Sequence, residues 1–147
     1  MTEQIITETP KKLFHLSEEN HDGEYFKPRI PNSIVTNGDY AEDDKVRRVC
    51  FSNSISGAFF AINFRGGYEK LYVHVPENIE DIVRRRKLCK PTQEQVFDVD
   101  YCGEYWIKCK VKLKCIGYIK IGYRFERFGW YKPKVHFKYL EKYAINI

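Results

Sequence analysis

Three polar residues of this sequence stand where strands are predicted to begin or end, and their side chains can carry acid–base and electrostatic chemistry. His15 stands in a short apolar run near the start, Ser52 follows the next such run, and Glu104 opens a long alternating run. Histidine exchanges a proton near neutral pH, and a fixed carboxylate stabilises a developing positive charge. Polar groups at strand ends can line a cleft while the strands behind them form core. These three residues are therefore the first candidates for a catalytic site.

Strands and helices must position these residues, and the periodicity of apolar side chains predicts where they lie. Strands are predicted at residues 13–16, 48–51, 71–75, 95–99, 104–115, 118–125 and 130–139. Helices are predicted at residues 55–64 and 76–87, and Ser52 or Ser54 can cap the first. Gly117 interrupts the alternation of its strand, which predicts a bulge. The order of elements predicts an α+β fold with a mainly antiparallel sheet and two or three short helices.

Length and composition limit the organisation of the chain. The 147 residues suffice for one hydrophobic core, so we predict a flexible arm at residues 1–12 and a single α+β domain at residues 13–147. The five cysteines are odd in number and lack zinc-site spacing, which predicts reduced thiols and no metal centre. The sequence has no uncharged run of membrane-spanning length and no signal-like start, so we expect a cytoplasmic protein without a membrane partner.

The segments around the candidate residues follow one another in a recognisable order. They are Leu13–Ser17, Val49–Ser54 ahead of a predicted helix, and Gly103–Ile107. Over roughly residues 13–123, this order resembles the ADP-ribosyltransferase superfamily. The resemblance implies a domain that binds NAD or another nucleotide, cleaves the nicotinamide bond, and passes ADP-ribose to a protein, nucleic acid or water.

The resemblance also implies a role for each candidate residue. His15 would anchor the nicotinamide ribose or amide, and Ser52 would support the pocket. Glu104 would hold the ribose 2′-hydroxyl and stabilise the oxocarbenium-like transition state, which agrees with the chemistry of a fixed carboxylate. The remaining implied cofactor-binding residues are Phe51, Ser54, Tyr72 and Arg48. A guanidinium binds a pyrophosphate through two hydrogen bonds, so Arg29, Arg47, Arg48 or Arg65 could meet that group. A catalytically inactive relative that only binds a nucleotide fits the same residues.

Basic residues concentrate in the second half of the chain, whereas the first half is acidic, within a net charge of +5. One basic pattern lies at the end of the second predicted helix, where the helix dipole favours cations: Arg84, Arg85 and Arg86. The other, here called the lysine comb, is predicted on one face of a single strand: Lys108, Lys110, Lys112 and Lys114. Both patterns are also typical of ordinary solvated surfaces.

These basic patterns predict an alternative function. A non-enzymatic binding module would contact nucleic acid or an acidic protein surface through the basic strand face, with nearby aromatic rings stacked on unpaired bases. A third hypothesis is a protein that acts through a protein interface alone. The small size and the abundance of Lys, Tyr, Ile and Asn are similar to accessory proteins of phages and mobile elements. That similarity predicts a host protein as target, in the host cytoplasm, and interference with host defence.

Overall fold

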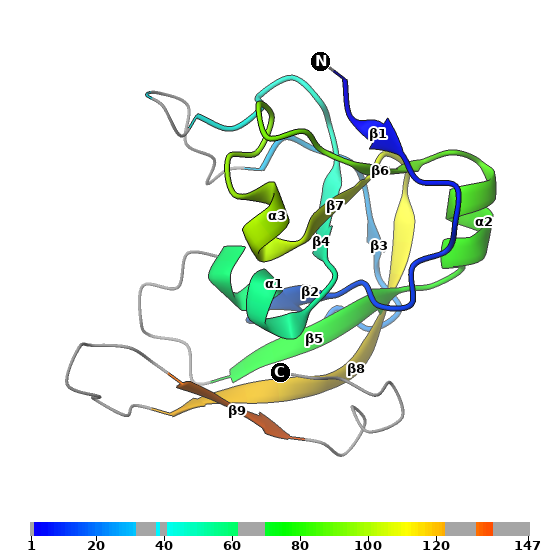
Figure 1. Cartoon of the computed structure of the whole chain (residues 1–147). Coiled ribbons are helices and arrows are strands. Elements are labelled where there is room, and N and C mark those ends of the chain that lie inside the picture. Colours follow the sequence, from blue (N-terminus) through cyan, green and yellow to red (C-terminus); the bar gives the residue numbers. More distant parts are fainter. Residues whose placement is uncertain (1, 32–37, 39–40, 62–69, 123–131, 137–147) are drawn as a thin grey trace.

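The structure is a computed structural model that describes residues 2–31, 38, 41–61, 70–122 and 132–136 (Figure 1). The strands in these ranges are β1 (Gln4–Ile5), β2 (His15–Ser17), β3 (Tyr25–Phe26), β4 (Val49–Ser52), β5 (Lys70–Pro76), β6 (Leu88–Lys90), β7 (Glu104–Ile107), β8 (Val111–Gly122) and β9 (Lys132–His136). The helices are α1 (Ile55–Ala61), α2 (Ile79–Arg84) and α3 (Val99–Cys102). The predicted α+β class is confirmed.

The strands form two antiparallel sheets. One has four strands in the order β1-β6-β7-β4, and the other has five, in which β2-β5-β8-β3 are neighbours and β9 also pairs with β8. An isolated bridge between Phe14 and Ser52 joins the start of β2 to the end of β4. A second bridge, between Arg29 and Arg48, joins the segment after β3 to the start of β4. The two sheets therefore meet along β4.

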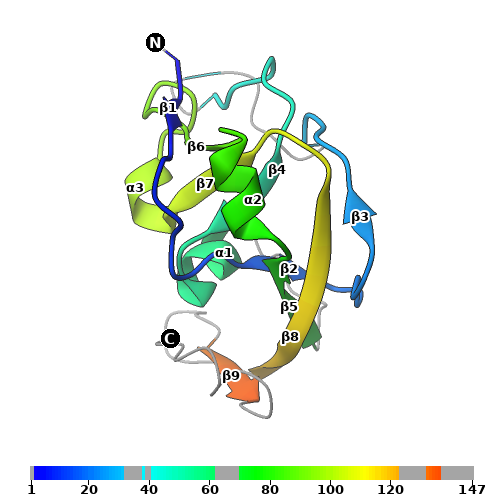
Figure 2. The same ribbon diagram turned by 90° about the vertical axis from the view of Figure 1, so that its right-hand side faces the viewer.

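Three apolar clusters hold these layers together. Helix α1 packs on one face of β5 and β8, through Phe14, Leu16, Ile55, Ala58, Leu71, Val73, Ile116 and Ile119. Helix α2 closes a second cluster built on β4, β7 and the start of β8, through Leu13, Val49, Phe51, Ile82, Val83, Leu88, Ile107, Val111 and Leu113. Buried Trp106 centres the third, beside α3. Strand β8 thus contributes to two cores, and Figure 2 shows how far it runs through the molecule.

The predicted strand at residues 104–115 is wrong, because it divides into β7 and β8. Ile107 and Val111 are both buried, so the alternation continues through a bend that changes sheets. The amide of Lys108 donates to the carbonyl oxygen of Lys87 at 2.8 Å as the last bond between the β6 and β7 segments, and residues 108–110 belong to no strand. The four lysines of the comb therefore do not share one strand face.

Two other predicted segments also differ from the structure. Residues 95–99 were expected as a strand but form turns and the start of α3, since the amide of Val96 donates to the carbonyl oxygen of Thr92 at 2.9 Å. Val96 and Val99 are buried at helical spacing, which a short apolar run does not distinguish from a strand. Within the predicted arm 1–12, β1 pairs with β6, so that part of the arm belongs to a sheet.

Other predictions are confirmed. The strands at 48–51 and 71–75 are β4 and β5, and the helix predicted near Pro76 is α2. The predicted bulge at Gly117 is present, because Val73 pairs with Gly117 whereas His74 pairs with Cys115, which leaves one extra residue in β8. The first helix is described as far as Ala61, and residues 62–64 of its predicted range lie outside the described residues. Residues 123–125, 130–131 and 137–139 of the last two predicted strands do so too.

Candidate functional site

The pairing of β4 with β7 brings two of the three candidate residues together. Ser52 lies directly opposite Glu104 in the antiparallel register, so their side chains share one face of the sheet. The Ser52 hydroxyl donates to the carbonyl oxygen of Cys102, and Ser52 is only 3% exposed. Ser52 therefore ties β4 to the end of α3, while Glu104 is the more accessible of the two.

Glu104 is a partly buried carboxyl group whose pKa lies near neutral pH. Its Oε2 accepts a hydrogen bond from Nε1 of Trp106 at 3.1 Å. Burial raises the pKa of Glu104 to about 7, and the neighbouring Glu42 and Asp98 carboxylates favour the protonated form further. The Trp106 hydrogen bond and the Arg48 charge act in the opposite direction. A carboxyl group with this pKa can take up or release a proton at neutral pH.

His15 lies on the other face of β4. Its ring centroid is 5.9 Å from that of Phe51, and its Nδ1 donates to the carbonyl oxygen of Cys50 at 3.1 Å. Because successive strand residues point to opposite faces, Phe51 faces away from the side that carries Ser52 and Glu104. The structure therefore does not bring His15 and Glu104 to one cleft.

Sequence reasoning missed a cluster of three histidines around His15. The His15 ring lies 6.2 Å from that of His74, which in turn lies 5.7 Å from that of His21. Phe26 packs edge-on against His15, at 5.5 Å between ring centroids, and against His21. Burial lowers the pKa of both His15 and His74, in the latter to about 4. No spacing signals this cluster, because the register of β2 with β5 creates it.

Arg48, one of the four arginines that could meet a pyrophosphate, is an internal residue. Its guanidinium lies 4.2 Å from the Trp106 ring centroid and donates to the carbonyl oxygens of Asp43 and Val46 at 2.8 and 2.9 Å. Only 1% of its surface is exposed. Arg48 thus anchors the segment before β4 and does not present its charge at the surface.

The other residues implied as cofactor-binding are spread over the fold. Phe51 is buried in the core beneath α2. The Ser54 hydroxyl accepts a hydrogen bond from the Gly57 amide at 3.0 Å and so caps α1, as predicted for Ser52 or Ser54. Tyr72 lies on the five-stranded sheet, with its ring centroid 6.3 Å from that of Tyr118.

The structure does bring the two basic patterns of the sequence together. Nη2 of Arg85, at the end of α2, lies 3.7 Å from Sγ of Cys109, and Lys87 accepts the backbone hydrogen bond from Lys108. Figure 2 shows α2 beside the start of β8, with β3 on the other side of that strand. The joined surface, here called the basic ridge, consists of Arg84, Arg85, Arg86, Lys87, Lys108, Lys110 and Lys112. Lys114 is exposed further along β8.

An exposed tyrosine stands at the edge of the basic ridge. Tyr25 is 57% exposed and pairs with Lys112 across β3 and β8. The Nζ atoms of Lys110 and Lys112 lie 4.7 and 5.8 Å from its ring centroid. Cations at these distances from an aromatic face are attracted to it. The ring and its two lysines therefore form one polar, partly aromatic surface.

Several ridge cations have carboxylate partners. These are Asp81 for Arg84 and Arg85, Glu77 for Lys112 at 3.8 Å, and Glu3 for Lys108. The pairs of Arg84, Arg85 and Lys112 are exposed, and exposed ion pairs contribute about 1 kcal/mol or less, so a phosphate can replace those carboxylates. Glu3 is only 9% exposed and its pKa is lowered to about 2, mainly by the Lys108 hydrogen bond, so Lys108 stays paired. The other cations therefore leave the ridge able to bind an anion.

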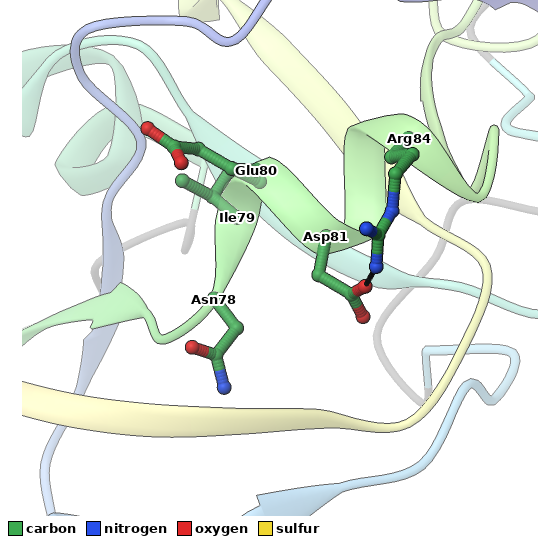
Figure 3. Close-up of a pocket in the computed structure, with 5 residues that line it drawn as sticks. All are labelled: Asn78, Ile79, Glu80, Asp81 and Arg84. Carbon is green, nitrogen blue, oxygen red and sulfur yellow. Dashed lines mark hydrogen bonds and ion pairs between the residues drawn. The ribbon is translucent and has the colours of Figure 1, made fainter.

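A shallow recess of about 600 Å³ lies along α2, lined by Asn78, Ile79, Glu80, Asp81 and the ridge residue Arg84 (Figure 3). An ion pair between Asp81 and Arg84 spans part of it. The recess includes neither Glu104 nor His15, so it is separate from the candidate catalytic residues.

The part of the chain that the structure describes contains no group of three or more His, Cys, Asp or Glu residues able to hold a metal ion. Nor does any described helix have the length and apolar character needed to cross a membrane. No family model, curated protein or solved structure matches this chain. The fold and surface define a small α+β domain with a joined basic surface.

Proposed function

We propose that the protein is a binding module that holds nucleic acid against the basic ridge. The observation that carries this proposal is the junction of two basic segments more than 20 residues apart, through Arg85 with Cys109 and Lys87 with Lys108. Arginine and lysine side chains that converge on one surface are suited to several phosphates at once. The proposal follows the binding-module hypothesis of the sequence analysis, with the basic ridge in place of a single strand face.

Tyr25 favours nucleic acid over an acidic protein as the partner. Its ring is exposed between Lys110 and Lys112, an arrangement in which a base can stack while the lysines contact the flanking phosphates. An acidic protein surface would make only a general apolar contact with the exposed ring. The ridge is therefore better suited to a nucleic acid, which has both phosphates and flat bases.

The test is the salt dependence of oligonucleotide binding, measured by fluorescence anisotropy. For a single-stranded oligonucleotide, whose bases are free to stack on Tyr25, the logarithm of affinity should fall linearly with the logarithm of salt concentration, with a slope of about −0.7 per phosphate contacted. Neutralising Arg84, Lys110 and Lys112 to Gln should make that slope less negative by about 2. Lys45→Gln is the matched control, since Lys45 is exposed on the segment before β4. Binding of polyglutamate but not of DNA would instead make the partner an acidic protein.

A second candidate function is the NAD-dependent ADP-ribosyl transfer implied by the sequence resemblance. One observation favours it, namely the partly buried Glu104 carboxyl group, with its pKa near 7, opposite Ser52. The position of His15 on the other strand face does not support it. Calorimetric titration with NAD, with detection of released nicotinamide, tests the activity on the wild type and on Glu104→Gln. Nicotinamide release that disappears in the variant would support the transferase. If the wild type neither binds NAD nor releases nicotinamide, the transferase hypothesis is rejected.

A further inference from the structure

A serine, a histidine and a glutamate between the end of β2 and the start of β3 form one hydrogen-bonded chain. Oγ of Ser17, the last residue of β2, lies 3.0 Å from Nε2 of His21. The other ring nitrogen of His21, Nδ1, bonds to Oε2 of Glu24. Ser17, His21 and Glu24 are here called the triad. None of them belongs to the basic ridge.

The bonding partners indicate which atoms of the triad carry hydrogen. An ionised carboxylate only accepts hydrogen bonds, so Nδ1 of His21 carries a hydrogen and donates it to Glu24. Nε2 of the neutral ring then has a lone pair and accepts from the Ser17 hydroxyl. The amide of Glu19 donates to the same hydroxyl oxygen at 3.3 Å, which leaves the hydroxyl hydrogen directed at His21. In this arrangement a base can take the proton of a nucleophile.

The backbone that carries His21 and Glu24 is tied to two strands of the five-stranded sheet. The amide of His21 donates to Nε2 of His74 on β5 at 2.9 Å. The amide of Gly23 donates to the carbonyl oxygen of Leu113 on β8 at 2.8 Å, and the amide of Leu113 donates to that of Glu24 at 2.9 Å. The triad therefore lies on a turn whose backbone is fixed, as a catalytic group requires.

The His21 ring is packed as well as hydrogen-bonded, yet the triad is open to solvent. Phe26 meets the ring edge-on, with 4.9 Å between ring centroids, and the His74 ring lies 5.7 Å away. The side chain of His21 is 18% exposed and that of Glu24 57%, and Ser17 is half-buried. Figure 2 shows the turn between β2 and β3 at the edge of the molecule. A small ligand can therefore reach the hydroxyl while the imidazole keeps its orientation.

We propose that Ser17 is a nucleophile that His21 activates for the hydrolysis of small carboxylic esters. In the first step, Oγ of Ser17 bonds to the carbonyl carbon of the ester, and its proton passes to Nε2 of His21. The bond to the alcohol oxygen breaks, and the leaving alkoxide takes that proton. Water then attacks the acyl-serine and gives a proton to His21. The carboxylic acid leaves as that proton returns to Ser17.

Glu24 is a positioning residue in these steps. It holds the imidazole in the required tautomer and stabilises the imidazolium that forms. Because the triad lies on a surface turn and not in the recess along α2, the acyl group that it accepts is short. The inference goes beyond the proposed function and rests on different residues.

The nucleophile is tested with a fluorescent fluorophosphonate, which labels activated serines, and with p-nitrophenyl acetate, which leaves an acetyl group on the attacking oxygen. Mass spectrometry of peptides should place both groups on Ser17. Ser17→Ala should lose both, whereas Ser56→Ala, at an exposed serine of α1, should keep them. Absence of both groups from Ser17 in the wild-type protein would overturn the proposal.

The base and the carboxylate are tested by the rate at which Ser17 is acetylated. His21→Gln should slow it about 100-fold or more, as expected for the loss of a general base. Glu24→Gln should slow it at least about tenfold, and Glu24→Asp, which keeps the carboxylate, should recover part of the rate. Circular dichroism and thermal melting verify that each variant is folded.

An unchanged rate in a folded His21→Gln protein would also overturn the proposal. Equal rates in the Gln and Asp variants of Glu24 would reject its positioning role. Acetylation is measured without oligonucleotide, so its outcome is independent of whether the ridge binds nucleic acid.

Discussion

The backbone amide of His21 donates a hydrogen bond to Nε2 of His74 at 2.9 Å, although 53 residues separate them. Nδ1 of His74 donates in turn to the carbonyl oxygen of His15 at 3.3 Å. Both ring nitrogens of His74 are thus in use, and Nε2 can accept the bond only while it carries no proton. The neutral imidazole therefore ties the segment between β2 and β3 to β5.

Acid should weaken the fold through His74. Its pKa is lowered from 6.5 to about 4 in the folded state, mainly by burial, and His15 and His21 act in the same direction. The unfolded chain therefore binds more protons between these values, so stability is full above about pH 6.5 and falls as pH drops to about 4, by up to about 3 kcal/mol. Chemical denaturation of the wild type across this range measures the loss. His74→Gln should be less stable at pH 7 but should show a flatter pH profile, and an unchanged profile would contradict the assignment.

Glu104 should have the opposite dependence on pH. Burial raises its folded-state pKa from 4.5 to about 7, so its protonated form is favoured in the native protein. Its stabilising effect is full below about pH 4.5 and is lost as pH rises through about 7. Glu104→Gln should therefore raise the free energy of unfolding at pH 8 by about 2 kcal/mol and change it little at pH 4.5. Equal effects at both pH values would show that burial does not control this carboxyl group.

Replacing Arg48 should destabilise the protein without affecting ligand binding at the surface. Arg48→Ala removes a buried cation that holds two carbonyl oxygens and stacks on Trp106, and should cost about 3 kcal/mol in the free energy of unfolding. Arg48→Lys should recover little, because an ammonium group lacks the planar fork that makes these contacts together. Urea denaturation of the three proteins distinguishes the cases. A Lys variant as stable as the wild type would show that charge alone is needed.

Gly57 should not tolerate alanine, although alanine favours helices. A Cβ atom at this position of α1 would collide with the carbonyl oxygen of Cys102, which is backbone and cannot rotate aside. Gly57→Ala should therefore lower the free energy of unfolding by about 1 to 3 kcal/mol instead of raising it. Ser56→Ala, at the exposed neighbouring position, is the control and should be nearly neutral. A stabilised Gly57→Ala protein would mean that α1 and α3 separate at little cost.

Local patterns predicted the elements of this fold better than their arrangement. The helix at Ile79–Arg84 and the strand at Lys70–Pro76 follow from apolar spacing and a cationic helix end, which act within a few residues. The bend between Ile107 and Val111 was missed because both residues are buried, so burial alternates as it would in one strand.

The candidate sites depend on contacts that sequence spacing does not encode. Ser52 opposite Glu104, and His15 opposite His74, arise from strand register between distant segments. His15 and Glu104 are separated because they lie on opposite faces of β4. A shift of one residue in the strand register would place a side chain on the other face of the sheet. Residue types identified these candidate groups, but only the pairing of the strands determines which of them lie together.

The extra residue in β8 sets the phase of the whole strand. Before the bulge, Val111 and Leu113 point into the core beneath α2, and after it Ile119 points into the core beneath α1. Without the extra residue, the period of two would turn Tyr118 toward α1 and Ile119 away from it. The bulge at Gly117 therefore reverses the inward side of β8, so that one strand supplies apolar side chains to two cores on its opposite faces.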